Sequence, residues 1–178
     1  MRLYLLRHAI AVSRGTPGYA QDAQRPLTEE GHAQASDVAR GLKRLKLPIT
    51  LIVTSPLVRA AQTAAHVQET LGGRIAVKER GELRPESHPA ETSQMLKWLV
   101  PHEHIVLVGH EPHLTAWIAE LCAGVGGVRC VMKKAGIACI EIDEVPPRAG
   151  SGALRWLMTP KQLALIGRAG ARVEEERE

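Results

Sequence analysis

Short apolar runs alternate along the chain with longer segments in which apolar residues recur every third or fourth position. The first pattern predicts buried strands, and the second predicts amphipathic helices. The run HIVLVGH at 104–110 is the strongest strand signal. The predicted strands are residues 2–7, 51–55, 74–79, 104–110, 136–143 and 153–159.

Capping residues mark where helices begin and end between these strands. Thr28 precedes two glutamates and offers an N-cap with an acidic first turn, and the helix that follows stops at Pro48. Ser55 and Pro56 predict the start of a second helix, because proline suits the first helical position. A glycine pair at 72–73 closes it. Two more helices are predicted, over residues 91–100 and from Pro112 to Leu121.

This alternation of strands and helices predicts an α/β fold, with three α/β/α layers around a mainly parallel central sheet. A stretch rich in proline and glycine, 146–152, separates the last two strands and is typical of a hairpin with a long loop. Residues 1–170 are predicted to form a single domain, and the charged residues 171–178 are predicted to be a frayed tail.

The composition excludes several classes of protein. Hydrophobic residues make up 44% of the 178 residues and charged residues 24%, which argues against disorder. No apolar run approaches the ~18 residues of a membrane span. Aromatic residues make up only 3%, so an aromatic platform for single-stranded nucleic acid is not expected. The net charge of +4 slightly favours anionic partners such as phosphates, although it is also ordinary for a soluble basic protein.

The three cysteines, Cys122, Cys130 and Cys139, fit neither a disulfide framework nor a zinc site, because the count is odd and the gaps are wide. Since they lie in apolar stretches, they are predicted to be buried free thiols. The chain starts directly with a strand-like segment and shows no secretion signal, so a reducing cytoplasm is the expected compartment.

Four charged or titratable side chains are predicted to meet at the carboxyl edge of the sheet, where ligands bind in such folds. Arg7 and His8 end the first strand, His110 ends the strand at 104–110, and Arg59 lies one turn into the helix after the second strand. Considered singly, a histidine at a strand end is more often structural, and an arginine on a helix is usually a surface charge. Their spacing alone therefore leaves a phosphate pocket and a structural role equally open.

Such a set suits a phosphoryl group. Arginine presents planar donors that match phosphate oxygens in pairs, and the helix starts at Ser55 and Pro112 could add backbone donors. A neutral imidazole can attack phosphorus without a metal or another cofactor. A metal site is the alternative, because four histidines crowd one segment: His102, His104, His110 and His113. They match neither an H-E-x-x-H nor a C-x-x-C pattern, so a metal site is disfavoured.

The sequence resembles the histidine phosphatase (phosphoglycerate mutase-like) superfamily at four motifs. LRHA at 6–9 resembles the family's Arg-His-Gly signature, and RPLTEEGHAQA at 25–35 matches the stretch before its first long helix. TSPLVRAAQTA at 54–64 and VGHEPHL at 108–114 resemble its second and third motifs. The motifs follow the family's order and spacing, and the resemblance spans residues 2 to about 160.

The resemblance implies a role for each of the four residues. His8 is the nucleophile that is transiently phosphorylated, and Arg7 and Arg59 bind the phosphoryl oxygens. His110 binds the phosphoryl group and stabilises the transition state, after which water hydrolyses the intermediate. One departure from the signature is Ala9, which stands in place of glycine; alanine is acceptable there if φ is negative.

A second departure bears on the substrate. Many family members have a Glu-Leu-x-Glu segment whose last glutamate protonates a leaving alkoxide, and Pro85 occupies that position here. Glu86 and His88 are the candidate substitutes, although both can equally be plain loop residues. Phosphohistidine needs less acid help than an alkyl phosphate, because its leaving imidazole can be protonated beforehand. This favours phosphohistidine as the substrate.

The segment from Pro85 to His110 is also too short for a large lid, which leaves an open pocket. Pro85 in place of the glutamate and this short segment both resemble the SixA-type branch of small bacterial phosphohistidine phosphatases. That resemblance implies a phosphotransfer domain as the partner protein. The chain itself is expected to be a monomer or a weak homo-oligomer.

Three alternatives remain. A small-molecule phosphomonoesterase would use the same pocket with Glu86 or His88 as the acid. A mutase is disfavoured, although Lys133 and Lys134 could lie at the rim. A non-catalytic phosphate-binding module is disfavoured because none of the four residues is missing.

Overall fold

The computed structural model describes residues 1–124 and 127–169. The predicted frayed tail, residues 171–178, lies outside the described residues. Six strands of the described chain form one sheet in the order β3-β2-β4-β1-β5-β6. They are β1 (Arg2–Arg7), β2 (Leu51–Thr54), β3 (Ala76–Glu79), β4 (His104–Gly109), β5 (Ile137–Glu141) and β6 (Ala153–Met158).

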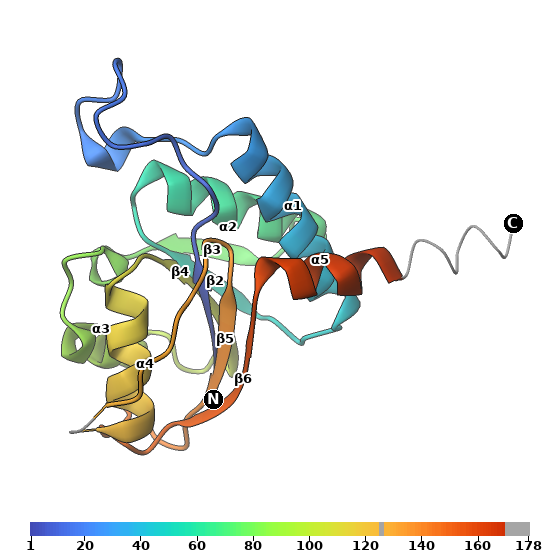
Figure 1. Cartoon of the computed structure of the whole chain (residues 1–178). Helices are drawn as coiled ribbons and strands as arrows, with labels where there is room; N and C mark the ends of the chain where they lie inside the picture. Colours follow the sequence, from blue (N-terminus) through green and yellow to red (C-terminus); the bar gives the residue numbers. More distant parts are fainter. Residues whose placement is uncertain (125–126, 170–178) are drawn as a thin grey trace, which may run out of the picture.

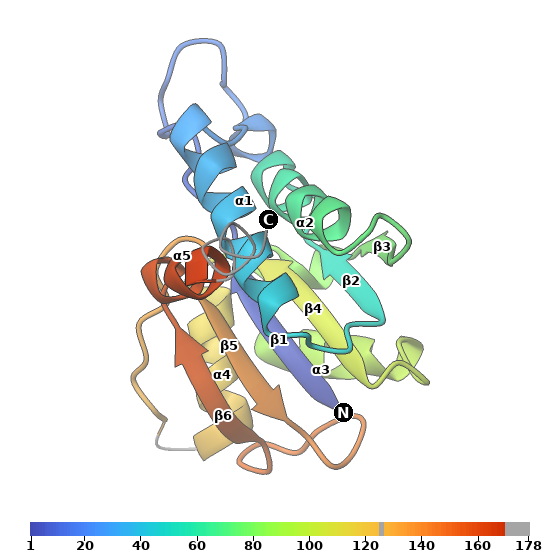
Figure 2. The same cartoon turned by 90° about the vertical axis from the view of Figure 1, so that its right-hand side faces the viewer.

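The sheet is mainly parallel, as the sequence predicts. Strands β3, β2, β4 and β1 pair in parallel, whereas β5 runs antiparallel to both β1 and β6. Figure 2 shows the sheet with helices on both sides, so the predicted three-layer α/β/α fold is confirmed. The helices are α1 (Glu29–Arg44), α2 (Val58–Thr70), α3 (Pro89–Met95), α4 (His113–Ala123) and α5 (Pro160–Ala169).

Each face of the sheet has its own hydrophobic core, because the side chains of a strand alternate between the two faces. Tyr4 and Leu6 of β1 pack on the side of α1, α2 and α5, together with Leu163 of α5. Leu3 and Leu5 pack on the side of α3 and α4. Figure 1 shows this separation, with α3 and α4 on one side of the sheet and the other three helices opposite. The central strands are thereby buried on both faces.

The register of β1 and β4 brings two predicted site residues side by side. Arg7 pairs with Gly109 across the parallel ladder, and the N–H of His8 donates to the Gly109 carbonyl over 3.0 Å. The residues that follow the two strands, His8 and His110, therefore leave the sheet at the same edge. The segment between β1 and α1 extends from this edge (Figure 1).

Two of the predicted helix starts have different outcomes. The Thr28 side chain accepts a hydrogen bond from the Gly31 N–H over 3.0 Å, so the N-cap of α1 is confirmed. The predicted start at Ser55 and Pro56 is wrong, because α2 begins at Val58 with Leu57 in the N-cap position. Ser55 does not cap the helix; its hydroxyl group forms a hydrogen bond with the His110 ring.

The remaining differences lie in α3 and α5. The helix predicted over 91–100 begins earlier, at Pro89, because His88 and Glu91 form a capping box, and it continues as a short 3-10 helix, η3 (Leu96–Trp98). The sequence analysis missed α5. A signal was present: Thr159 and Gln162 make reciprocal hydrogen bonds around the helix start, which is the spacing of a capping box.

The cysteine prediction holds only in part. Cys139 in β5 is buried, whereas Cys122 and Cys130 are half-buried. All three are free thiols, and burial raises the pKa of each. Within residues 1–124 and 127–169, no helix has the length and apolar character to cross a membrane.

Candidate active site

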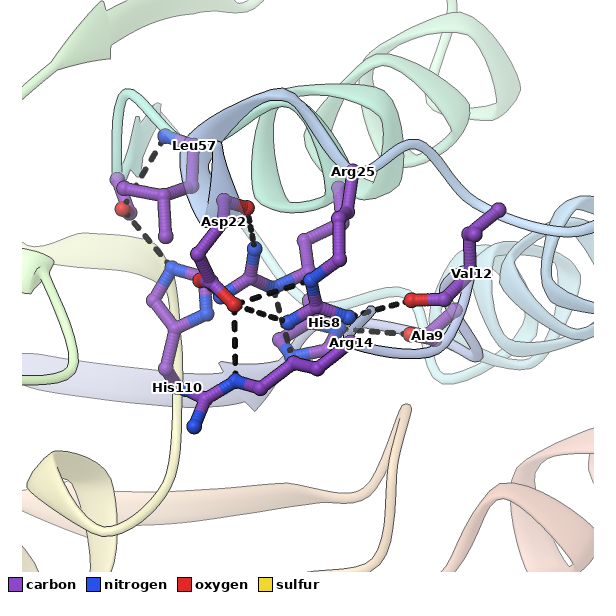
Figure 3. Close-up of polar contacts among 10 residues, drawn as sticks. His8, Ala9, Val12, Arg14, Asp22, Arg25, Leu57 and His110 are labelled. Carbon is purple, nitrogen blue, oxygen red and sulfur yellow. Dashed lines mark hydrogen bonds and ion pairs between the residues drawn. The ribbon is translucent and has the colours of Figure 1, made fainter. Parts of the chain in front are cut away.

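A cavity of about 320 Å³ lies at the carboxyl edge of the sheet and is lined by all four side chains singled out in the sequence: Arg7, His8, Arg59 and His110. They come from the ends of β1 and β4 and from the first turn of α2. Figure 3 shows His8 and His110 among their polar neighbours. Residues from three distant parts of the sequence thus share one polar cavity, an arrangement that fits an anionic group.

The His8 ring has one defined tautomer. Its Nδ1 lies 2.7 Å from the Ala9 carbonyl oxygen, which can only accept, so Nδ1 carries the proton. Its Nε2 accepts a hydrogen bond from Arg59 Nε over 3.3 Å, so Nε2 holds the free electron pair. Both contacts require the same tautomer. The nitrogen available for nucleophilic attack is therefore Nε2.

The environment keeps this ring neutral. Burial, together with the positive charges of Arg59, Arg7 and Lys134, lowers the pKa of His8 to about 3, and the hydrogen bond to the Ala9 carbonyl opposes this shift only in part. An ordinary histidine would be partly protonated at pH 6.5. At neutral pH His8 consequently retains the electron pair that an attack on phosphorus requires.

Arg59 is almost completely buried, with only 2% of its surface exposed. Its Nη1 donates to the Asp22 carbonyl oxygen over 2.8 Å, and its Nη2 donates to Asp22 Oδ2 over 2.9 Å. Asp22 also accepts hydrogen bonds from Arg14 and Arg25 (Figure 3). Sequence reasoning missed Asp22, because nothing in the sequence connects it to an arginine 37 positions away.

Arg7, the residue before His8, also lines the cavity. Its Nη1 donates to the Met132 carbonyl oxygen over 2.6 Å, which ties the end of β1 to the segment before β5. Its Nε is buried and has no hydrogen-bond partner among the described residues. A buried N–H without a partner is costly unless an acceptor arrives, and a phosphoryl oxygen is such an acceptor.

His110 is 1% exposed, and its Nε2 lies 2.9 Å from the Ser55 hydroxyl oxygen. Burial lowers its pKa well below the ordinary range, and repulsion from His8 and Arg59 adds to the effect. Its Nδ1 is buried and has no hydrogen-bond partner among the described residues. The site therefore holds two neutral imidazoles beside buried arginines.

Glu86 and His88, the two candidate general acids, lie apart from the other predicted site residues. Pro85 lines the cavity, at the position where the family resemblance leads one to expect a glutamate. Glu86 and His88 are exposed, and neither is among the residues that line the cavity. The His88 side chain instead accepts from the Ala90 N–H at the start of α3, which is a structural role.

Glu111 is a carboxylate that the sequence analysis did not consider. It follows His110, lines the same cavity and accepts a hydrogen bond from the Thr115 hydroxyl over 2.5 Å at Oε2. Its Oε1 is buried without a partner among the described residues. Burial raises the pKa of Glu111 above its ordinary value, although Thr115 and Arg7 act in the opposite direction. A carboxyl group in such surroundings holds its proton more readily than an exposed one.

The fold accommodates an alanine at position 9, where the family signature has glycine. Ala9 is fully buried, its N–H donates to the Thr63 hydroxyl over 3.1 Å, and its φ is not positive. The methyl group therefore needs no strained backbone. Glycine is not required at this position.

The crowded histidines do not gather around a metal. His102 contacts Thr50, His104 contacts Tyr4, and the His113 ring contacts the Thr92 hydroxyl. Among residues 1–124 and 127–169, no group of three or more His, Cys, Asp or Glu side chains is arranged to hold a metal ion. Of these histidines, only His110 lines the cavity.

Comparisons with known proteins support the same family as the motifs. The sequence model of the histidine phosphatase superfamily (branch 1) matches residues 3–88. An uncharacterized protein of Picosynechococcus sp. (strain PCC 7002) is 38% identical over 165 residues, which are 92% of this chain and 99% of that protein. Phosphohistidine phosphatase SixA of Escherichia coli (strain K12) is 28% identical over 167 residues, which are 93% of this chain and 98% of that protein.

A solved structure extends the likeness to three dimensions. The protein histidine phosphatase SixA complexed with tungstate superimposes with a TM-score of 0.79 at 28% identity, covering 92% of this chain and 99% of that one. The likeness in sequence and structure therefore extends well past residue 88 and across nearly all of the chain.

Proposed function

This chain belongs to the histidine phosphatase superfamily, and from that premise we propose that it hydrolyses phosphohistidine on a partner protein through a covalent intermediate on His8. One observation carries the proposal: His8 Nε2 has a free electron pair and faces the Arg59 Nε–H in a cavity that four further cationic residues line, Arg7, Arg14, Arg25 and Lys134. The name of the SixA relative agrees with this substrate.

In the proposed first step, the His8 Nε2 electron pair attacks the phosphorus of the substrate. A new P–N bond forms while the P–N bond to the leaving imidazole breaks, and the leaving ring departs with a proton taken up beforehand from solvent. Arg7 and Arg59 hold the equatorial oxygens, whose charge grows in the transition state, and His110 contacts the same group. The His8 Nδ1–H remains on the Ala9 carbonyl throughout, which keeps the ring oriented.

In the second step, water attacks the phosphorus of phospho-His8. The bond to Nε2 breaks, its electrons return to the ring, and inorganic phosphate leaves. No cofactor takes part in this scheme. The partner would be a phosphotransfer domain in the cytoplasm, and the chain would act as a monomer or a weak homo-oligomer.

Pro85 supports phosphohistidine over an alkyl phosphate as the substrate. An alkoxide is a poor leaving group that needs a positioned acid, and proline has no proton to give. Glu86 and His88 are exposed and outside the cavity lining, so neither is in place to supply the proton without movement.

A small-molecule phosphomonoesterase is the second candidate function, and Glu111 is the observation that favours it. Glu111 lines the cavity, and its pKa is raised by burial, so it is a better-placed acid than Glu86 or His88. In this alternative the carboxyl group of Glu111 would turn towards the leaving oxygen and donate its proton.

A paired turnover assay tests the proposal. Purified wild-type protein and His8→Ala would be given a histidine-phosphorylated phosphotransfer domain and, separately, an alkyl phosphate monoester. The proposal expects fast phosphate release from the first substrate, little from the second, and neither with His8→Ala. His102→Ala, a histidine remote from the cavity, is the matched control and should retain full activity. Equal or faster turnover of the monoester would favour the second candidate, and unchanged turnover by His8→Ala would overturn the mechanism.

A further inference from the structure

Asp22 lies in the segment between β1 and α1, where it begins the short 3-10 helix η1 (Asp22–Gln24). Three arginines meet at its carboxylate, and Figure 3 labels two of them, Arg14 and Arg25. Oδ1 accepts from Arg14 Nε over 2.9 Å and from Arg25 Nη2 over 2.7 Å, and Oδ2 accepts from Arg59 Nη2 over 2.9 Å. Asp22 thus connects the segment that projects from the sheet edge with the arginine that contacts His8.

The three ion pairs differ in strength, because solvent weakens exposed pairs. The Arg14 side chain is 77% exposed, so its pair contributes little. The Arg25 and Arg59 side chains are only 10% and 3% exposed, so their pairs with the 36% exposed Asp22 side chain are less open to solvent than the Arg14 pair. Arg25 fixes Asp22 from one side, and Asp22 in turn binds Arg59 on the other.

Arg59 is held at two points by this one residue, since its Nη1 also donates to the Asp22 carbonyl oxygen over 2.8 Å. A guanidinium group is planar and rigid, so two contacts at its outer end fix the direction of the Nε–H at its inner end. That Nε–H faces His8 Nε2 at 3.3 Å. Successive hydrogen bonds thus connect the Asp22 carboxylate, the Arg59 guanidinium and the His8 imidazole.

A phosphorus atom that bonds to His8 Nε2 brings its oxygens next to that nitrogen. The Arg59 N–H that faces Nε2 is therefore already beside the place that those oxygens must occupy. We propose that Asp22 is a positioning residue, which holds the Arg59 guanidinium beside His8 Nε2, so that its N–H passes from that nitrogen to the phosphoryl oxygens when the new P–N bond forms. This inference rests on the proposed function and adds a residue to its machinery.

The negative charge of Asp22 also affects how tightly the cavity binds an anion, and this effect opposes the one on turnover. Its single negative charge partly offsets the positive charges around the cavity, so its removal should favour the binding of an anion. Its removal should also release Arg59 from its fixed orientation, which slows the chemical step. A positioning role therefore predicts that turnover and phosphate affinity move apart, whereas a merely structural role predicts that both fall together.

The test compares Asp22→Asn with wild type and with a matched control, Asp37→Asn. Asp37 also pairs with two arginines, Arg40 and Arg168, but lies on α1 away from the cavity. We expect Asp22→Asn to lower kcat about 10- to 100-fold, since a misplaced catalytic contact costs that much. The Kd for inorganic phosphate, measured by calorimetry, should stay unchanged or fall. Asp37→Asn should match wild type in both measurements.

A second readout needs no substrate. Diethyl pyrocarbonate reacts with neutral imidazole nitrogens, and in the wild type the Arg59 N–H engages the Nε2 electron pair of His8. Asp22→Asn should speed the modification of His8, followed by mass spectrometry, severalfold over wild type. Asp22→Glu keeps the charge but moves the carboxylate, so it should lower kcat in the same way. It replaces Asp22→Asn in the test if that variant does not fold.

The outcomes separate the two proposals. If the wild type releases no phosphate from a phosphohistidine substrate, the proposed function fails, whatever the variants do. If the wild type is active and the folded Asp22 variants match its kcat and its rate of His8 modification, the positioning role is wrong. It is equally wrong if kcat and phosphate affinity fall together with the melting temperature.

Discussion

The rings of His8 and His110 lie 4.9 Å apart between their centroids and are tilted by 52° to each other. Both are buried, and in each the charge of the other ring or of Arg59 opposes protonation. Two neutral imidazoles beside two arginines can receive a doubly charged phosphoryl group without first losing protons. The pH dependence of the protein follows from this pairing.

Activity should depend little on His8 titration across the physiological range. Attack requires neutral His8, whose pKa is lowered to about 3 by burial and by Arg59, Arg7 and Lys134. The kcat/KM should therefore rise with pH through a pKa near 3 as His8 loses its proton, and His8 should contribute no limb between pH 5 and 8. Initial rates in a series of buffers check this. A rising limb centred above the ordinary histidine value of about 6.5 would contradict the assignment.

Stability should fall on acidification, in a window set by buried histidines. Burial lowers the pKa of His8 to about 3 and that of His113 to about 4. Below the unfolded value of about 6.5, the unfolded chain binds these protons and the folded chain does not, so acid favours unfolding. Each group steepens the fall by up to about 1.4 kcal/mol per pH unit. Urea unfolding at pH 7, 6, 5 and 4 measures the slope, and His8→Asn should make it shallower.

Glu111 distinguishes the two candidate functions. If Glu111 donates a proton to a leaving alkoxide, Glu111→Gln should lower the turnover of alkyl phosphate monoesters about 10²- to 10⁴-fold. Phosphohistidine should be affected far less, because its leaving ring takes its proton from solvent. Glu86→Gln is the control and should change neither rate, since Glu86 is exposed and outside the cavity lining. Equal losses on both substrates would mean that Glu111 does not act as the acid.

Gly31 sets how closely α1 approaches the segment after His8. A Cβ atom at Gly31 would lie 1.8 Å from the Ile10 carbonyl oxygen, a contact that the backbone cannot accommodate without moving. Gly31→Ala should therefore lower the free energy of unfolding by about 3 kcal/mol, even though alanine favours a helix. Gly81→Ala, where the added atom meets open space, should be nearly neutral. Chemical denaturation of both variants compares them, and equal stability would exclude the clash.

The central strands β1, β2 and β4 were predictable because they are short apolar runs, and the start of α1 was predictable because Thr28 caps it through its own side chain. The start of α2 was not, because the Ser55 hydroxyl bonds to the His110 ring, 55 residues further along the chain, and to the N–H of Leu57, which precedes the first helical residue. Local capping chemistry predicts a helix start only where no distant group competes for the capping side chain. The same chemistry at Thr159 and Gln162 marks the overlooked helix α5.

Some residues of the candidate site could also be predicted from the sequence, and others could not. Arg7, His8, Arg59 and His110 could be nominated because each stands beside a strand end within a motif, and strand ends meet at one edge of a parallel sheet. Asp22 lies in an irregular segment, so its position depends on how that segment folds back, which no periodicity encodes. For Glu111, the residue type was visible, but the burial that raises its pKa appears only in the folded chain.

The hydrogen bond from the His8 N–H to the Gly109 carbonyl belongs to two central strands that are buried on both faces. Hydrogen bonds of this kind open only when the whole cooperative unit unfolds, not by local fraying. The distance between His8 and His110 is therefore maintained for as long as the sheet is folded. Loss of turnover on heating should coincide with loss of the sheet, which makes catalysis a reporter of global unfolding.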